Sequence, residues 1–139
     1  MRLNRSRFLD QLLANGTTTA LVFATSSVNS VDAFFAEALR RNLRMVSGKV
    51  LMDRHAPDEL CDTPQSAYDD SSSLIDKWRG HGRLGYAVTP RFAPTSSDAQ
   101  LEVAGALLKE NSDAYLHTHL SENVDEIAWV GELFPEQQG

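Results

Sequence analysis

The sequence LGYAVTPRFAPTS, residues 84–96, is the stretch that decides the fold. Its first half, residues 84–89, is a short apolar run of strand length, and its second half is a loop with two prolines. Ser97, with Gln100 three residues later, has the pattern of a capping box, which predicts that a helix begins directly after the loop. A strand, a loop and a helix in this order form the repeating unit of a parallel α/β fold.

The same alternation extends from this stretch toward both ends of the chain. Apolar and β-branched runs predict further strands at residues 17–23, 43–51 and 114–119. Apolar positions at helical spacing, together with start and stop signals, predict helices at residues 5–14, 31–39, from Pro64 through Trp78, 98–110 and 125–133. Residues 52–61, which follow the strand predicted at residues 43–51, are predicted to form a long polar loop.

Four strands that alternate with helices imply parallel pairing and right-handed crossovers. Two α/β architectures fit this pattern: a small open sheet, complete at this length, and part of a (β/α)₈ TIM barrel, which needs roughly 250 residues. Periodicity does not choose between them. In both, ligands bind at the carboxyl ends of the strands. Because Arg91, His119 and Glu122 all follow or end predicted strands, we expect them to converge at that edge.

Composition excludes several classes of protein. The chain has 139 residues, enough for one domain, and its net charge of −6 without a basic run past the N-terminus argues against nucleic-acid binding. No apolar stretch is long enough to span a membrane. Cys61 is the single cysteine, so no internal disulfide can form, which fits a cytoplasmic protein. Cys61 has no CxxC partner, and we interpret it as a free structural thiol.

The segment HTHLSEN, residues 117–123, lies where the last predicted strand ends. A strand-end imidazole with a carboxylate three residues later can place a metal ligand, His119, and a proton shuttle, Glu122, in one pocket. The alternatives are a histidine satisfied by a neighbouring carbonyl and an ordinary acid at a helix start. His117 faces the same side as His119 and can be a second zinc ligand, although we favour a supporting role for it.

Arg91 and Phe92 offer a different kind of chemistry. The guanidinium presents a planar fork to an edge that carries a carbonyl and a nitrogen, and the phenyl ring presents a face to a flat ring. The pair therefore suits a purine. The alternative is a surface arginine paired with a carboxylate, beside a core phenylalanine. Asp53 and Arg54, which follow the strand predicted at residues 43–51, can pair with each other or with a partner chain, and we assign them no catalytic role.

Four segments together resemble the guanine deaminases, members of the metal-dependent amidohydrolase superfamily. They are NGTTTA at residues 15–20, GKVLMDR at 48–54, YAVTPRFAPTS at 86–96 and HTHLSEN at 117–123. The resemblance runs from about Phe8 to Pro135. It implies a (β/α)₈ barrel with one zinc ion, in which His119 binds zinc and borders the substrate, Glu122 shuttles protons, and Arg91 with Phe92 holds guanine.

The implied reaction is hydrolysis of guanine to xanthine and ammonia by a water molecule whose pKa zinc lowers. The family pattern also has an HxH pair on the first barrel strand, a histidine on the sixth and an aspartate on the eighth, and this sequence contains none of these. Residues 1–139 are therefore predicted to be a single segment of the barrel, approximately strands two to five.

This ligand count has consequences for the isolated chain. It predicts no tightly bound zinc and no activity in the chain alone. Open sheet edges predict self-association into a homo-oligomer. The alternative function is a non-catalytic purine-binding or self-associating α/β module.

Overall fold

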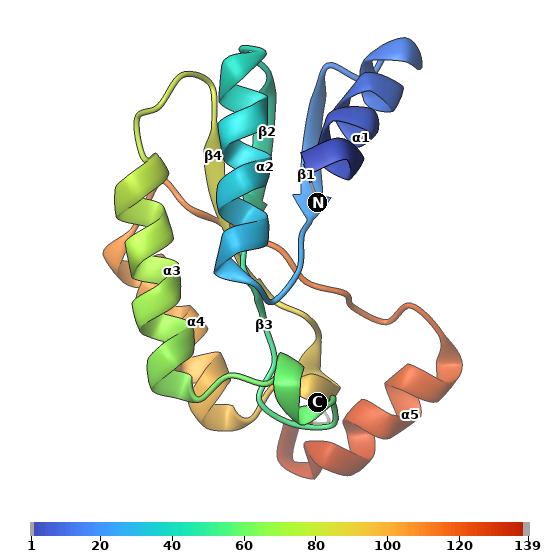
Figure 1. The fold of residues 1–139 in the computed structure, drawn as a ribbon. Coiled ribbons are helices and arrows are strands. Elements are labelled where there is room, and N and C mark those ends of the chain that lie inside the picture. The colour runs from blue at the N-terminus through green and yellow to red at the C-terminus, as the bar shows by residue number, and fades with distance from the viewer. Residues whose placement is uncertain (1, 138–139) are drawn as a thin grey trace.

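The structure, a computed structural model, describes residues 2–137 (Figure 1). The strands are β1 (Thr19–Phe23), β2 (Arg44–Gly48), β3 (Val50–Leu51), β4 (Gly85–Pro90) and β5 (Tyr115–Leu116). The helices are α1 (Arg2–Ala14), α2 (Val28–Arg40), α3 (Pro64–Trp78), α4 (Asp98–Glu110) and α5 (Val124–Leu133). Short 3₁₀ turns, η1 to η3, span Asp58–Leu60, Ala93–Thr95 and Pro135–Gln137. None of the helices in this described part is long and apolar enough to cross a membrane.

The strands lie side by side in the order in which the chain makes them. β1 pairs with β2, β2 pairs with β4, and β4 pairs with β5, all in parallel. β3 continues the line of β2, because Val50 and Leu51 pair with Thr89 and Pro90 farther along β4. Consecutive order is that of a barrel, whereas a doubly wound open sheet reverses its strand order at a switch point. The structure therefore chooses the barrel alternative.

Four helices form one layer on one face of this sheet. In the row, α1 contacts α2, α2 contacts α3, and α3 contacts α4. Side chains of these helices and of the strands meet in one apolar core, whose fully buried members include Leu9, Phe35, Met45, Leu74 and Leu107. The opposite face, which carries Leu21 and Tyr115, stays open, and these side chains are 47% and 49% exposed. One covered face and one open face are what an incomplete barrel wall presents.

The strand predicted at residues 43–51 is wrong in one respect, because it is interrupted at Lys49. The backbone N–H of Lys49 donates to the Tyr86 side-chain hydroxyl, 3.3 Å away, rather than to a backbone carbonyl of β4. Its ammonium group, only 2% exposed, forms ion pairs with Asp62 and with Asp70, the latter at 3.7 Å. A buried charge must be paired. Because the Lys49 side chain reaches these carboxylates, its backbone does not continue the hydrogen-bond ladder of the strand.

The strand predicted at residues 114–119 is also shorter than expected, because β5 contains only Tyr115 and Leu116. Beyond it, the N–H groups of His117 and His119 still donate to the carbonyls of Val88 and Arg91, at 3.0 Å each. No strand of the described chain flanks β5 on its other side. β1 likewise begins at Thr19, two residues later than predicted, and the loop at 52–61 contains the η1 turn.

Helix starts follow the predicted signals, with one difference. Thr63 and Ser66 form a reciprocal capping box before Pro64, as the sequence indicates. Ser97 accepts a hydrogen bond from the Gln100 N–H at 3.2 Å, which confirms the start of α4. The Gln100 side chain does not reach back to complete the box. It is fully buried, and neither of its amide atoms has a partner within the described residues.

Candidate active site

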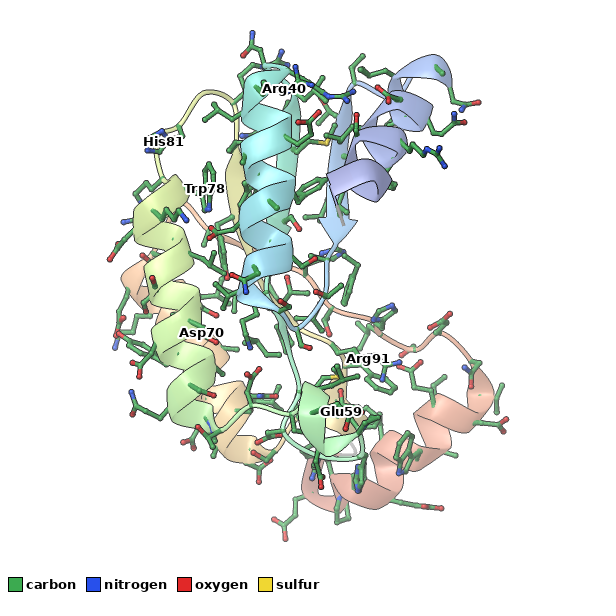
Figure 2. The ribbon with its side chains drawn as sticks, in the orientation of Figure 1. Arg40, Glu59, Asp70, Trp78, His81 and Arg91 are labelled. Atoms are coloured by element: carbon green, nitrogen blue, oxygen red, sulfur yellow. The ribbon has the colours of Figure 1, made fainter. Side chains whose placement is uncertain are left out.

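The C-terminal edge of the sheet brings together the ends of β4 and β5. Arg91 directly follows β4, and His119 lies three residues beyond β5. Figure 2 shows Arg91 between the ends of the strands and α5. The backbone of Arg91 is tied to both neighbouring strands, since its N–H donates to the Leu51 carbonyl at 3.1 Å and its carbonyl accepts from the His119 N–H at 3.0 Å. Arg91 and His119 are therefore neighbours at this edge, while the predicted convergence of both side chains with that of Glu122 stays a prediction.

The ring of His119 is oriented by the same carbonyl. Its Nδ1 atom lies 2.9 Å from the carbonyl oxygen of Arg91. Because a carbonyl only accepts hydrogen bonds, Nδ1 carries a proton, and in the neutral imidazole Nε2 keeps its lone pair. A histidine that ligates a metal through Nε2 usually has its Nδ1–H held in this way. The contact with a neighbouring carbonyl, which was the alternative to metal binding, is thus present. It leaves Nε2 available as a ligand.

Phe23, the last residue of β1, packs against both histidines of the HTH segment. Its ring centroid lies 4.4 Å from that of His119 and 4.5 Å from that of His117. Burial, and secondarily the neighbouring His119, lower the pKa of His117. Sequence reasoning missed Phe23 as a site residue. The available signal was its place at the carboxyl end of a predicted strand, the edge where a ligand is expected.

Arg91 and Phe92 form the predicted pair on the loop after β4. The Arg91 Cζ atom lies 4.7 Å from the centroid of the Phe92 ring, and the guanidinium is exposed. No ion pair of Arg91 with a carboxylate occurs in residues 2–137, so the alternative of a surface salt bridge is not what this structure shows. The Phe92 ring meets those of His119 and Trp129 edge-on, at 6.4 Å and 6.1 Å.

Glu122 stands at the turn between β5 and α5. Ser121 before it has a φ of 52°, and the Glu122 N–H donates to the Glu126 carboxylate at 3.1 Å. Asn123 caps α5 by accepting from the Glu126 N–H at 2.9 Å. The Glu122 carboxylate itself is exposed and makes no hydrogen bond within the described residues. It does not curl back over His119 here, so its predicted role stays a prediction.

The donor set fits a single metal ligand rather than a whole metal site. Across residues 2–137, no three side chains of His, Cys, Asp or Glu cluster closely enough to hold a metal ion. His55 Nδ1 lies 2.6 Å from the Pro94 carbonyl, as His119 Nδ1 does from that of Arg91 at 2.9 Å, and the free Cys61 thiol contacts the Ala56 carbonyl at 3.6 Å. His119, which lies at the carboxyl edge of the sheet, stays the predicted ligand.

An apolar cavity of about 400 Å³ borders His119 from the side of α4 and α5. Its walls include Leu101, Leu108, Leu116 and Ile127, and neither Arg91 nor Phe92 lines it. A purine needs hydrogen-bonding groups along its edge. The predicted purine-binding pair, Arg91 and Phe92, lies outside this cavity.

Comparison with protein families gives a match to the amidohydrolase family over residues 6–139. The chain belongs to the amidohydrolase family. This amidohydrolase chain is 57% identical to the guanine deaminase of Escherichia coli K12 over 132 residues, which make up 95% of the chain and 30% of that protein. It is 35% identical to the guanine deaminase of Dictyostelium discoideum over 93% of the chain and 29% of that protein.

Solved structures agree with this assignment. The E. coli guanine deaminase superposes with a TM-score of 0.96 at 55% identity, over 99% of the amidohydrolase chain and 32% of its own. Guanine deaminase from C. acetobutylicum with bound guanine gives a TM-score of 0.88 at 30% identity, over 96% and 32%. A zinc complex of atrazine chlorohydrolase from Arthrobacter aurescens, 21% identical with a TM-score of 0.79 over 96% and 32%, shares the fold. The strands are therefore consecutive units of a (β/α)₈ barrel, and the chain spans about a third of these relatives' length.

Proposed function

We propose that this amidohydrolase chain supplies the guanine-binding and proton-transfer side of a guanine deaminase barrel. The observation that carries the proposal is the meeting of Arg91, Phe92 and His119 at one sheet edge, with His119 held by the Arg91 carbonyl at 2.9 Å. The high identity to the E. coli guanine deaminase supports the same reaction. Guanine is accordingly the proposed substrate, and the cytoplasm is the proposed location.

Each residue has a distinct part in the proposed reaction. The Arg91 guanidinium donates to the carbonyl edge of the purine, and the Phe92 face packs on the ring. Glu122 takes a proton from the attacking water and delivers it to a ring nitrogen. A carbon–oxygen bond then forms at the carbon that carries the amino group, the remaining proton of the added hydroxyl passes to the amino nitrogen, and the carbon–nitrogen bond breaks to release ammonia. The exposed and unpaired carboxylate of Glu122 is free to make this transfer.

Zinc is the proposed cofactor, and His119 fits one of its ligand positions. A zinc ion held there would supply a water nucleophile near neutral pH. Catalytic zinc sites have three protein ligands, so the remaining ligands must come from outside this set of residues. The single oriented imidazole supports a contribution to the metal site rather than a complete one.

The test is a chimera in which this chain replaces the matched region of the E. coli guanine deaminase. The chimera should convert guanine to xanthine. Glu122→Gln should then lower kcat by about 10²–10⁴-fold, the usual contribution of general acid–base catalysis, with zinc content unchanged. Arg91→Ala should mainly raise KM. Asp125→Asn, three residues from Glu122 in the first turn of α5, is the matched control and should keep normal turnover.

Two results would contradict the proposal. A folded, zinc-loaded chimera that does not deaminate guanine would refute the substrate assignment. Near-normal turnover of Glu122→Gln would leave Glu122 as a helix-start acid. A non-catalytic purine-binding module, the alternative from sequence, would bind guanine in the chimera without turnover.

A further inference from the structure

We propose that the segment Met52–His55, here called the 52–55 clamp, positions Arg91 and Phe92, with Asp53 as its main positioning residue. The clamp contains the MDR part of the GKVLMDR motif, to which the proposed reaction assigns no role. It does not touch the substrate in this proposal. It acts through the loop of residues 91–97, so it rests on the proposed function for the identity of the ligand.

Three consecutive clamp residues hold three consecutive carbonyls of that loop. The backbone N–H of Asp53 donates to the Thr95 carbonyl at 3.0 Å, and Arg54 Nη2 donates to the Ala93 carbonyl at 3.1 Å. His55 Nδ1 lies 2.6 Å from the Pro94 carbonyl. The backbone of the loop is therefore bound along its length by one neighbouring segment.

The Asp53 carboxylate adds a second hold at the far end of the loop. One oxygen accepts from the Ser97 N–H at 2.7 Å, and the other accepts from the Ser97 hydroxyl. At the near end, the Arg91 N–H donates to the Leu51 carbonyl at 3.1 Å. Arg91 and Phe92 are thus enclosed between two anchored points. A cap for α4 alone would need only the contacts at Ser97.

The clamp also contacts α5, the helix that follows Glu122. The His55 ring lies 5.4 Å from the Trp129 ring, and the Arg54 Cζ atom lies 5.1 Å from the centroid of Phe134. Trp129 in turn meets Phe92. One segment thereby links the loop that carries Arg91 and Phe92 with α5 and with Phe134, which follows it.

His55 has a conformation that supports a positioning role. Its φ is 50°, in the left-handed region that residues other than glycine rarely adopt. Such a conformation is disfavoured by itself and persists where surrounding contacts determine it. The Pro94 carbonyl and the Trp129 ring provide those contacts.

The experiment compares the 139-residue chain with Asp53→Ala, Asp53→Asn and His55→Asn. Asparagine at position 53 still accepts from the Ser97 N–H, and asparagine at position 55 tolerates a positive φ. Asp98→Ala is the matched control, because Asp98 is an exposed acid in the first turn of α4. Two readouts are used: ¹H–¹⁵N spectra, with the Trp129 indole signal as local reporter and the Trp78 indole as reference, and equilibrium dialysis with radiolabelled guanine.

Asp53→Ala and His55→Asn should shift the Arg91, Phe92 and Trp129 signals while the Trp78 signal stays in place. Both should weaken guanine binding by at least about tenfold, since small misplacements of a binding group are costly. Asp53→Asn should restore most of the affinity, and Asp98→Ala should match wild type. If Asp53→Ala does not fold, His55→Asn decides the question.

Changes confined to Ser97 and α4, with guanine affinity unaltered, would make Asp53 a helix cap and overturn the proposal. If the isolated wild-type chain binds no guanine, the proposed function is judged in the chimera with the E. coli guanine deaminase. The clamp is then judged on the spectra alone: signals of Arg91, Phe92 and Trp129 that do not move in His55→Asn would refute it.

Discussion

Gly48, the last residue of β2, lies close to the backbone of Ala87 on β4. A Cβ atom built on Gly48 would stand 1.8 Å from the Ala87 carbonyl oxygen. That oxygen belongs to the backbone, so it cannot move aside as the end of a flexible side chain can. Gly105, in the middle of α4, has nothing within 4 Å of the same hypothetical atom. Only Gly48 must lack a side chain for steric reasons. At Gly105 there is room for one, so glycine there only lowers the stability of the helix.

Gly48→Ala should lower the free energy of unfolding by about 1–3 kcal/mol, the usual range for overpacking. Gly105→Ala should raise it by roughly 0.5–1 kcal/mol, because alanine is the better helix former. Urea unfolding of both variants, followed by circular dichroism, measures the difference. Equal effects of the two substitutions would show that the close approach at Gly48 relaxes easily.

At the scale of elements, α2 is joined to α1 by a charge cluster. Glu37 accepts hydrogen bonds from Arg40 and from Arg41, at 2.7 Å and 2.6 Å for the closest pairs, and Arg41 also reaches Asp10 on α1 at 2.5 Å. The hydrogen bonds from Arg40, then those from Arg41, lower the pKa of Glu37 from 4.5 to about 2. The ionised form of Glu37 is therefore favoured in the folded chain.

A lowered carboxyl pKa stabilises the fold above the unfolded value, and the contribution is lost as pH falls through the folded value. The stability difference between wild type and Glu37→Gln should be constant above pH 4.5 and vanish between pH 4.5 and about 2. Its size should be at most about 1 kcal/mol, because the pairs lie near the surface. Glu102→Gln, an exposed acid on α4, is the control. A difference that does not change with pH would contradict the pairing.

The whole molecule has one covered sheet face and one open face. Leu21 and Tyr115 point to the open face, and Leu116, at 56% exposed, lies on β5 at the end of the sheet. The outer side of β1 and that of β5 carry no further strand within the described chain. Apolar surface that stays exposed loses roughly 25 cal/mol of stabilising free energy per Å² relative to buried surface. Unpaired strand edges can form hydrogen bonds with another chain.

The purified 139-residue chain should therefore self-associate. Sedimentation velocity at micromolar concentration should show species larger than 15.4 kDa. Leu21→Lys, which places a charge on the open face, should shift the distribution toward monomer if association uses that face. A compact monomer that melts cooperatively would show that the half-barrel is stable alone.

Metal binding by the same chain is also a property of the whole molecule. With His119 as one oriented ligand, the isolated chain should hold no zinc after dialysis against a mild chelator, because a catalytic zinc needs three protein ligands. Atomic emission analysis of the dialysed protein measures this. Stoichiometric zinc would mean that His55, Cys61, His81 or His117 completes a site after rearrangement.

Local patterns in the sequence determined which segments are helices and strands, and where the polar residues of the site begin. Apolar periodicity and capping residues act within a few positions, so Thr63 and Ser97 mark helix starts without any knowledge of the fold. The ends of parallel strands share an edge, so Arg91 and His119 were predictable neighbours.

Only the tertiary structure decided the contacts between distant segments. Phe23 lies against His119, the 52–55 clamp holds carbonyls 93–95, and Lys49 interrupts its strand and pairs with Asp62. The position of the exposed Glu122 carboxylate was also decided by the tertiary structure, because it depends on how α5 packs after the turn. Each of these contacts forms after crossover connections have brought remote residues together, and periodicity within one element contains no information about that distance.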